Sequence, residues 1–177
     1  MTRVKICLVI LSLILCLSCS SQKAGQNVSP QNSVAPTTTA PRNSVDVVKV
    51  RALPVELKVN ETVDAVVEVS IQNGYHINAN PPTLPYLIAT ELTLPKSPDI
   101  SLGYVVYPDA LTKTFSFAEK PLAVYEGTVN IKARVKPEKS AKPGTQNLSA
   151  KLRVQACDDQ VCYAPGTLDV TIPLSIK

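Results

Sequence analysis

The chain has 177 residues, a formal net charge of +4 and 45% hydrophobic residues, with only 5% aromatic residues and no tryptophan. Residues 1–19 hold two basic and no acidic residues, so the rest of the chain has 16 basic and 14 acidic residues and a charge of +2. A charge this small, scattered along the chain, excludes the basic surface on which nucleic-acid binding depends.

Residues 1–19 are predicted to be an export signal. Two basic residues precede an apolar run from Ile6 to Leu17, which is too short for a comfortable membrane span. The run ends in the sequence LSCS, which resembles the end of a bacterial lipoprotein signal. The resemblance implies that Cys19 carries a lipid, with ordinary secretory cleavage and an uncleaved anchor as alternatives. All three interpretations export the rest of the chain, and the lipid would hold it on the periplasmic side of a bacterial membrane.

Residues 20–44 are predicted to form a disordered linker. The segment is rich in Ser, Gln, Asn, Pro and Thr and has almost no large apolar residues. It cannot bury enough surface to offset the entropy lost on ordering, so we expect it to space a domain from a membrane. Residues 45–177 are long enough for one domain with a core of its own.

Residues 45–177 are predicted to be β-structure throughout. The alternation is clearest over Val63 to Ile71, where every second residue is apolar. Further strands are expected over residues 45–50, 53–59, 87–94, 100–107, 122–135, 148–156 and 167–176, with loops over 74–86 and 108–121, a turn at 72–74 and a bend at 126–127. No segment has a helical period, and the chain's 15 prolines suit strands joined by turns. Eight or nine short strands predict an antiparallel β-sandwich with an immunoglobulin-like fold.

Cys157 and Cys162 are the only cysteines of this domain, and four residues separate them. Outside the cytoplasm such a pair can form a lasting disulfide. It cannot staple two sheets as an immunoglobulin disulfide does, because that bridge joins cysteines far apart in sequence. Closing so short a loop would contribute only about 2 kcal/mol to stability. A local structural brace therefore remains one interpretation, and a redox-active dithiol is the other.

A redox-active pair needs two sulfurs that can bridge, access for a partner thiolate, and a scaffold that stays folded in both redox states. A short hairpin at the end of a rigid sandwich would meet these needs. Asp158 and Asp159 lie between the cysteines, and their carboxylates disfavour a neighbouring thiolate. This favours a carrier whose disulfide is attacked by a partner over a stand-alone oxidant.

Other kinds of site have little support in the sequence. Structural zinc needs four ligands, whereas the domain has two cysteines and one histidine, His76. The only methionine is the initiator, which excludes a thioether copper site. His76 is interpreted as a polar loop or edge residue, and it has no evident nucleophile partner for a hydrolase. We expect no metal, flavin or nucleotide cofactor.

The stretch QACDDQVCYAP, set between an alternating strand and a closing strand, resembles the N-terminal domain of the thiol:disulfide interchange protein DsbD family. The Gly-Tyr-His stretch at 74–76 and the Val-Tyr-Glu-Gly stretch at 124–127 fit the same resemblance, which covers residues 45–177. It implies an immunoglobulin-like domain, part of a protein-disulfide reductase system, that takes electrons from a thioredoxin-like domain and passes them to other thiol-disulfide oxidoreductases. We expect the linker and lipid to replace the covalent attachment to membrane and thioredoxin-like domains found in the full reductase.

By position, the resemblance implies that Cys157 and Cys162 are the redox pair and that Cys162 forms the mixed disulfide. It also implies a cap loop within Asp109 to Lys120, where Phe115 or Phe117 would cover the sulfurs; ordinary core packing is the alternative for both rings. The other candidate site-lining residues are Tyr75, His76, Asp158, Asp159 and Tyr163. For Tyr75 and His76, a plain strand position is the alternative.

Overall fold

The computed structural model describes residues 43–177, so the predicted signal, the lipidation at Cys19 and nearly all of the predicted linker lie outside the described residues. The described chain forms one short 3-10 helix and twelve strands. In chain order they are η1 (Ser44–Val47), β1 (Val48–Ala52), β2 (Val55–Leu57), β3 (Val63–Ile71), β4 (His76–Asn78), β5 (Glu91–Thr93), β6 (Ile100–Val106), β7 (Leu111–Lys113), β8 (Leu122–Tyr125), β9 (Thr128–Pro137), β10 (Gly144–Val154), β11 (Ala156–Cys157) and β12 (Gly166–Ile176).

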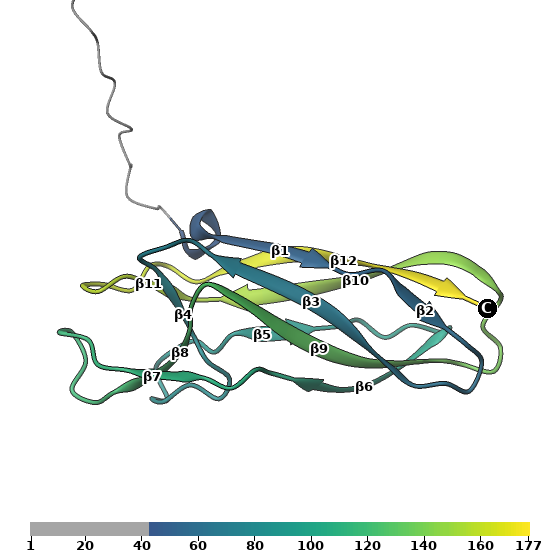
Figure 1. The fold of residues 1–177 in the computed structure, drawn as a ribbon, viewed down its shortest axis with the longest axis horizontal. Coiled ribbons are helices and arrows are strands. Elements are labelled where there is room, and N and C mark those ends of the chain that lie inside the picture. The colour runs from purple at the N-terminus through teal and green to yellow at the C-terminus, as the bar shows by residue number, and fades with distance from the viewer. Residues whose placement is uncertain (1–42) are drawn as a thin grey trace, which may run out of the picture. The chain divides into compact units, whose positions relative to one another are not determined.

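Two four-stranded sheets form a sandwich, as Figure 1 shows. One has the strand order β1-β3-β9-β6 and the other β2-β12-β10-β5. All pairings are antiparallel except that of β2 with β12. The predicted immunoglobulin-like antiparallel sandwich is therefore confirmed.

The core lies between these two sheets and follows the alternation in the sequence. Along β3, Ala65, Val67 and Val69 are fully buried, and Ile71 is nearly so. Strands β9, β10 and β12 repeat this pattern, with every second side chain buried. A side chain on such a strand is either in the core or in water, because successive residues point to opposite faces of a sheet.

Several predicted strand boundaries were wrong. The segment 45–50 begins as η1 rather than as a strand, and only residues 55–57 of the predicted strand 53–59 pair, so Leu53 and Val59 are exposed. Strand 87–94 shortens to 91–93, and the predicted loop 108–121 contains β7. Alternation alone overestimates strand length, because a strand also needs a neighbour with free hydrogen-bonding groups. The turn at Gly74 (φ 85°) and the bend at Gly127 (φ 63°) occur where predicted.

A third, smaller sheet with the order β11-β4-β8-β7 lies at one end of the sandwich, at the left in Figure 1. Its strands are only two to four residues long. The loop after β11 and the loop between β7 and β8 both project from this end, away from the C-terminus. Both cysteines of the domain belong to this end. Within residues 43–177, no helix is long and apolar enough to cross a membrane.

Candidate functional site

Cys157 and Cys162 form a disulfide, with the two Sγ atoms 2.00 Å apart. Cys157 ends β11 and is completely buried, whereas Cys162 is partly exposed. The two residues also face each other as an antiparallel bridge. The two halves of the disulfide therefore differ in exposure, and Cys162 is the more exposed half.

The loop between the cysteines is held by Asp158. Its carboxylate accepts hydrogen bonds from the backbone N–H groups of Gln160 and Val161, both at 2.8 Å, and from the hydroxyl of Tyr163. These bonds, that of Tyr163 foremost, lower the pKa of Asp158, and the same contact raises the pKa of Tyr163 to about 12. Asp158 folds the loop in the manner of an Asx turn, which is a role that its position between two cysteines does not reveal.

The base of the loop is held by Ser44, the first residue of η1. Its hydroxyl donates to the carbonyl of Ala164 at 2.6 Å and accepts from the N–H of Ala156 at 2.8 Å. Gly166 allows residues 43–44 to lie close to the start of β12, because a Cβ at position 166 would lie 2.5 Å from the Asn43 side chain. Ser44 falls in the predicted linker, and no sequence signal marks its role, because its partners lie more than one hundred residues away.

Gln155, directly before β11, is a second residue that sequence analysis missed. Its Oε1 accepts hydrogen bonds from the side chain of Asn78 and from the N–H of Ile88, both at 3.0 Å. Asn78 also donates to the carbonyl of Ile88 at 3.0 Å. Gln155 thus ties the cysteine segment to β4 and to the proline-rich loop after it. The only signal in the sequence is its place next to the cysteine stretch.

His76 lies directly opposite Cys157 in the pairing of β4 with β11. It is 1% exposed and lies inside the small sheet, between β11 and β8. Its interpretation as a loop or edge residue was therefore wrong, and its interpretation as a strand residue is confirmed. Burial lowers the pKa of its imidazole, and its Nε2 is buried without a hydrogen-bond partner. Residues directly opposite each other in an antiparallel pair share a face, so the imidazole and the Cys157 sulfur lie on the same side of the sheet.

The loop between β7 and β8 brings both phenylalanines to this end of the fold. The Phe115 ring stacks on His76 at a centroid distance of 4.1 Å, and the Phe117 ring stacks on Phe115 at 5.4 Å. Phe115 is buried in a small cluster with Leu122 and Val124, whereas Phe117 is 38% exposed. The Ser116 hydroxyl donates to the carbonyl of Asp159 at 3.2 Å, so this loop touches the cysteine loop directly.

Two hollows lie at this end of the fold, and one of them borders the disulfide. One, of about 300 Å³, is lined by Cys162 together with the exposed side chains of Tyr86, Phe117 and Val161. The other, of about 470 Å³, is polar and is lined by His76, Tyr75, Lys113, Glu126 and Asp159 among others. In it, the Lys113 ammonium forms an ion pair with Glu126 at 2.6 Å. Tyr75 also packs against Tyr163, with ring centroids 6.0 Å apart. The candidate residues thus gather at the small sheet and its loops, where the disulfide also lies.

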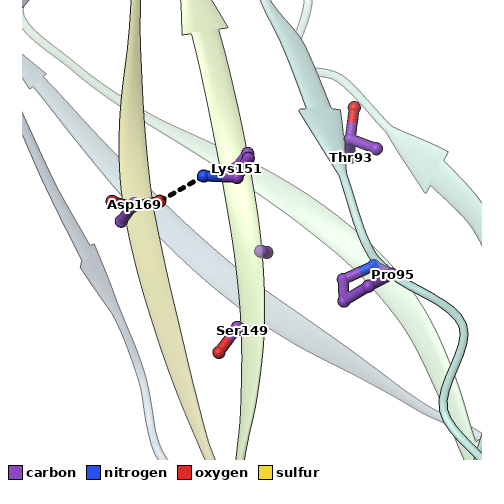
Figure 2. Close-up of a pocket in the computed structure, with 6 residues that line it drawn as sticks. Thr93, Pro95, Ser149, Lys151 and Asp169 are labelled. Carbon is purple, nitrogen blue, oxygen red and sulfur yellow. Dashed lines mark hydrogen bonds and ion pairs between the residues drawn. The ribbon is translucent and has the colours of Figure 1, made fainter.

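A third hollow, of about 210 Å³, lies on the outer face of the β10 sheet (Figure 2). Thr93, Pro95 and Ser149 line it, beside the exposed ion pair of Lys151 with Asp169. The ion pair is the only charged feature of its lining, and no cysteine or histidine takes part. Within residues 43–177, no group of three or more His, Cys, Asp or Glu side chains could hold a metal ion.

Residues 44–173 match the family described as thiol:disulfide interchange protein DsbD, N-terminal. The chain belongs to this family. The match spans η1 to most of β12, so both cysteines, His76 and the two phenylalanines fall within it. The predicted family is therefore confirmed, and the chain carries a thiol–disulfide interchange domain with a Cys-x4-Cys disulfide.

Two solved structures are similar to this chain, and the first of them has a TM-score that supports the fold. The N-terminal periplasmic domain of ScsB from Proteus mirabilis is 17% identical with a TM-score of 0.51, over 73% of this chain and 47% of that one. The reduced N-terminal domain of DsbD from Neisseria meningitidis is 18% identical with a TM-score of 0.37, over 62% of this chain and 75% of that one. Among curated proteins, no match to this chain was found.

Proposed function

We propose that this DsbD N-terminal-type domain relays electrons between proteins by reversible opening of the Cys157–Cys162 disulfide. The observation that carries the proposal is the asymmetry of the pair, in which a partly exposed Cys162 is bonded to a fully buried Cys157. Exchange proceeds by in-line attack of a thiolate on one sulfur, so the accessible sulfur is the one that a partner meets first.

The chemistry is a two-electron transfer. A partner thiolate attacks the Cys162 Sγ, the bond between the two cysteines breaks, and Cys157 leaves as a thiolate that takes up a proton. A second thiol of the partner then attacks the mixed disulfide and releases Cys162. The partner ends as a disulfide and this domain as a dithiol, and the reverse sequence passes the electrons on. The step needs no metal, flavin or nucleotide.

The loop between the cysteines has restraints other than the disulfide. Asp158, Ser44 and Gln155 hold it with hydrogen bonds that do not involve sulfur. Opening the disulfide removes one restraint of a short loop, and the others remain. We therefore expect the domain to stay folded with both thiols free, which a carrier requires and a purely structural brace does not.

The partner surface is proposed to be the hollow beside Cys162. The exposed side chains of Tyr86, Phe117 and Val161 line the same hollow as Cys162 and give it an apolar rim. Aromatic side chains of this kind dominate the energy of protein interfaces. The loop of residues 109–120 would act as a cap that moves aside, with Phe117 as its movable ring and Phe115 as its anchor. A thioredoxin-like or other thiol-disulfide oxidoreductase fits this surface, as the family assignment suggests.

The domain is proposed to work in the periplasm, where the related N-terminal domain of ScsB is described. Residues 1–19 would direct export, Cys19 would carry the lipid, and residues 20–44 would tether residues 45–177 to the membrane. The test is metabolic labelling with a radioactive fatty acid. Label that appears in the intact chain and is lost in Cys19→Ala supports the lipid anchor, and equal absence in both contradicts it.

The proposed relay is tested by the reduction potential of the pair, measured on the purified chain by glutathione and dithiothreitol titration with thiol trapping. Structural disulfides fall below roughly −300 mV and exchange-active ones above it. A potential above that boundary, with an unchanged circular dichroism spectrum on reduction, supports the relay. A disulfide that resists reduction, or a domain that unfolds when the disulfide opens, would show that the bond is purely structural.

A further inference from the structure

The proposed relay includes one proton transfer for which no acceptor has been named. Closing the disulfide from the mixed-disulfide state requires the Cys157 thiol to lose its proton, because the thiolate is the nucleophile. Cys157 is 0% exposed, so bulk water does not reach it. Burial in apolar surroundings raises the pKa of a thiol, which makes the unassisted step slow at neutral pH.

One titratable ring lies where it could take this proton. His76 is directly opposite Cys157 on the neighbouring strand, and residues so placed have Cβ atoms about 4.5–5.5 Å apart with side chains on the same face. The Nε2 of His76 is buried and has no partner. Buried polar atoms are nearly always hydrogen-bonded, so an unpartnered one beside a reacting pair points to a role in the reaction.

The surroundings of His76 suit a proton acceptor. Burial lowers the pKa of the ring, which favours its neutral form, the form that can accept a proton. The carboxylates of Glu126, Asp159 and Asp158 favour the charged ring, and the Lys113 ammonium opposes it. Phe115 stacked on the imidazole holds its plane. The polar hollow that His76 lines offers a path by which the proton can leave to water.

We infer that His76 is the proton acceptor for Cys157 when the disulfide closes. This inference rests on the proposed relay and names the residue that makes its buried half reactive. The proton passes from the Cys157 thiol to Nε2 of His76, and the thiolate attacks the Cys162 Sγ. The bond from Cys162 to the partner sulfur then breaks, the partner leaves as a thiolate, and the imidazolium returns its proton to water through the hollow.

The experiment uses the purified, reduced chain with the substitutions Cys7→Ser, Cys16→Ser and Cys19→Ser, so that Cys157 and Cys162 are its only thiols. Ellman's reagent is added in a stopped-flow instrument between pH 5.5 and 9. Attack by Cys162 releases a first thionitrobenzoate, and attack by Cys157 on the resulting mixed disulfide releases a second. The variant His76→Phe keeps an aromatic ring against Phe115 but cannot take a proton. We expect it to slow the second release at least tenfold at pH 7 while leaving the first unchanged. The rate of its second release should then rise about tenfold per pH unit.

A second variant, His76→Gln, keeps a polar group and serves if the phenylalanine variant does not fold. Equal second-release rates and pH profiles in the wild type and the folded variant would overturn the inference while leaving the relay intact. Equal slowing of both releases would also overturn it, because His76 would then act through the shape of the loop. A wild-type pair that releases no thionitrobenzoate at all would overturn the relay itself and the inference with it.

Discussion

The two ends of this domain are built on different principles. Between the two large sheets, the buried side chains are apolar and lie on long strands such as β3, β9, β10 and β12. At the small sheet, the strands are short and the buried side chains are partly polar. Among residues 43–177 the buried polar residues are Ser44, His76, Asn78 and Thr90. The Ser44 hydroxyl accepts a hydrogen bond from Ala156, next to Cys157. The Thr90 hydroxyl donates to the carbonyl of Asn78, whose side chain donates to Gln155. His76 is paired with Cys157 on the neighbouring strand.

The difference separates the interactions that stabilise the sandwich from those that position the disulfide. Apolar burial is non-directional and stabilises the sandwich whatever the state of the cysteines. Hydrogen bonds are directional and contribute little net free energy each, but they fix where a loop lies. The disulfide is therefore placed by hydrogen bonds on an apolar scaffold, and the proposed relay requires that this scaffold does not depend on the bond.

The largest effect is expected from the sandwich core. Leu152→Ala removes a fully buried side chain of β10 and should lower the free energy of unfolding by about 2–5 kcal/mol, through lost burial and the remaining cavity. The reduction potential should stay as in the wild type. Urea unfolding measures the first and thiol trapping the second, with the exposed Leu53→Ala as the matched control. A large change of the reduction potential in Leu152→Ala would show that the sandwich core and the disulfide site are not independent.

An intermediate effect is expected from the hydrogen bonds of the site. Asn78→Ala removes two part-buried hydrogen bonds, to Gln155 Oε1 and to the Ile88 carbonyl, at a cost of about 1–3 kcal/mol, although Gln155 Oε1 keeps the N–H of Ile88. Because Gln155 precedes the cysteine segment, we also expect this variant to change the reduction potential. Asn147→Ala, an exposed position on β10, is the control. An unchanged potential in Asn78→Ala would show that these bonds do not position the disulfide.

A smaller effect is expected from opening the disulfide itself. The loop it closes spans five residues in sequence, so its loss should lower the free energy of unfolding by no more than about 2 kcal/mol. Urea unfolding of the chain with and without dithiothreitol measures the difference, and Cys162→Ser in both conditions is the control for the reductant. Collapse of the whole domain on reduction would instead make the bond a structural element of the fold.

The smallest effect is expected from Tyr163. The pKa of its hydroxyl is raised to about 12 by the hydrogen bond to Asp158, so the folded state favours the protonated form. This contribution is complete below pH 10, the ordinary value of tyrosine, and is lost as the pH rises through 12. Tyr163→Phe should remove this fall in the free energy of unfolding between pH 10 and 12, whereas Tyr86→Phe should leave the fall unchanged. Identical profiles for wild type and Tyr163→Phe would contradict the contact.

The sequence determined the framework of this protein. Alternation over residues 63–71 placed the right side chains in the core, the glycines at 74 and 127 marked turns, and the spacing of Cys157 and Cys162 with their neighbours indicated the family. These signals are local, because the period of a strand, the conformational freedom of glycine and a short motif are all properties of adjacent residues.

The tertiary structure alone decided how the site is assembled. His76 became the buried neighbour of Cys157 through strand pairing, and Ser44 and Gln155 hold the loop through partners that lie in distant segments. The same packing separated Phe115, which is buried against His76, from Phe117, which lies at the surface beside Cys162. None of this has a periodic or compositional signal, because a hydrogen bond or a ring contact between distant segments depends on the register of the strands that carry them.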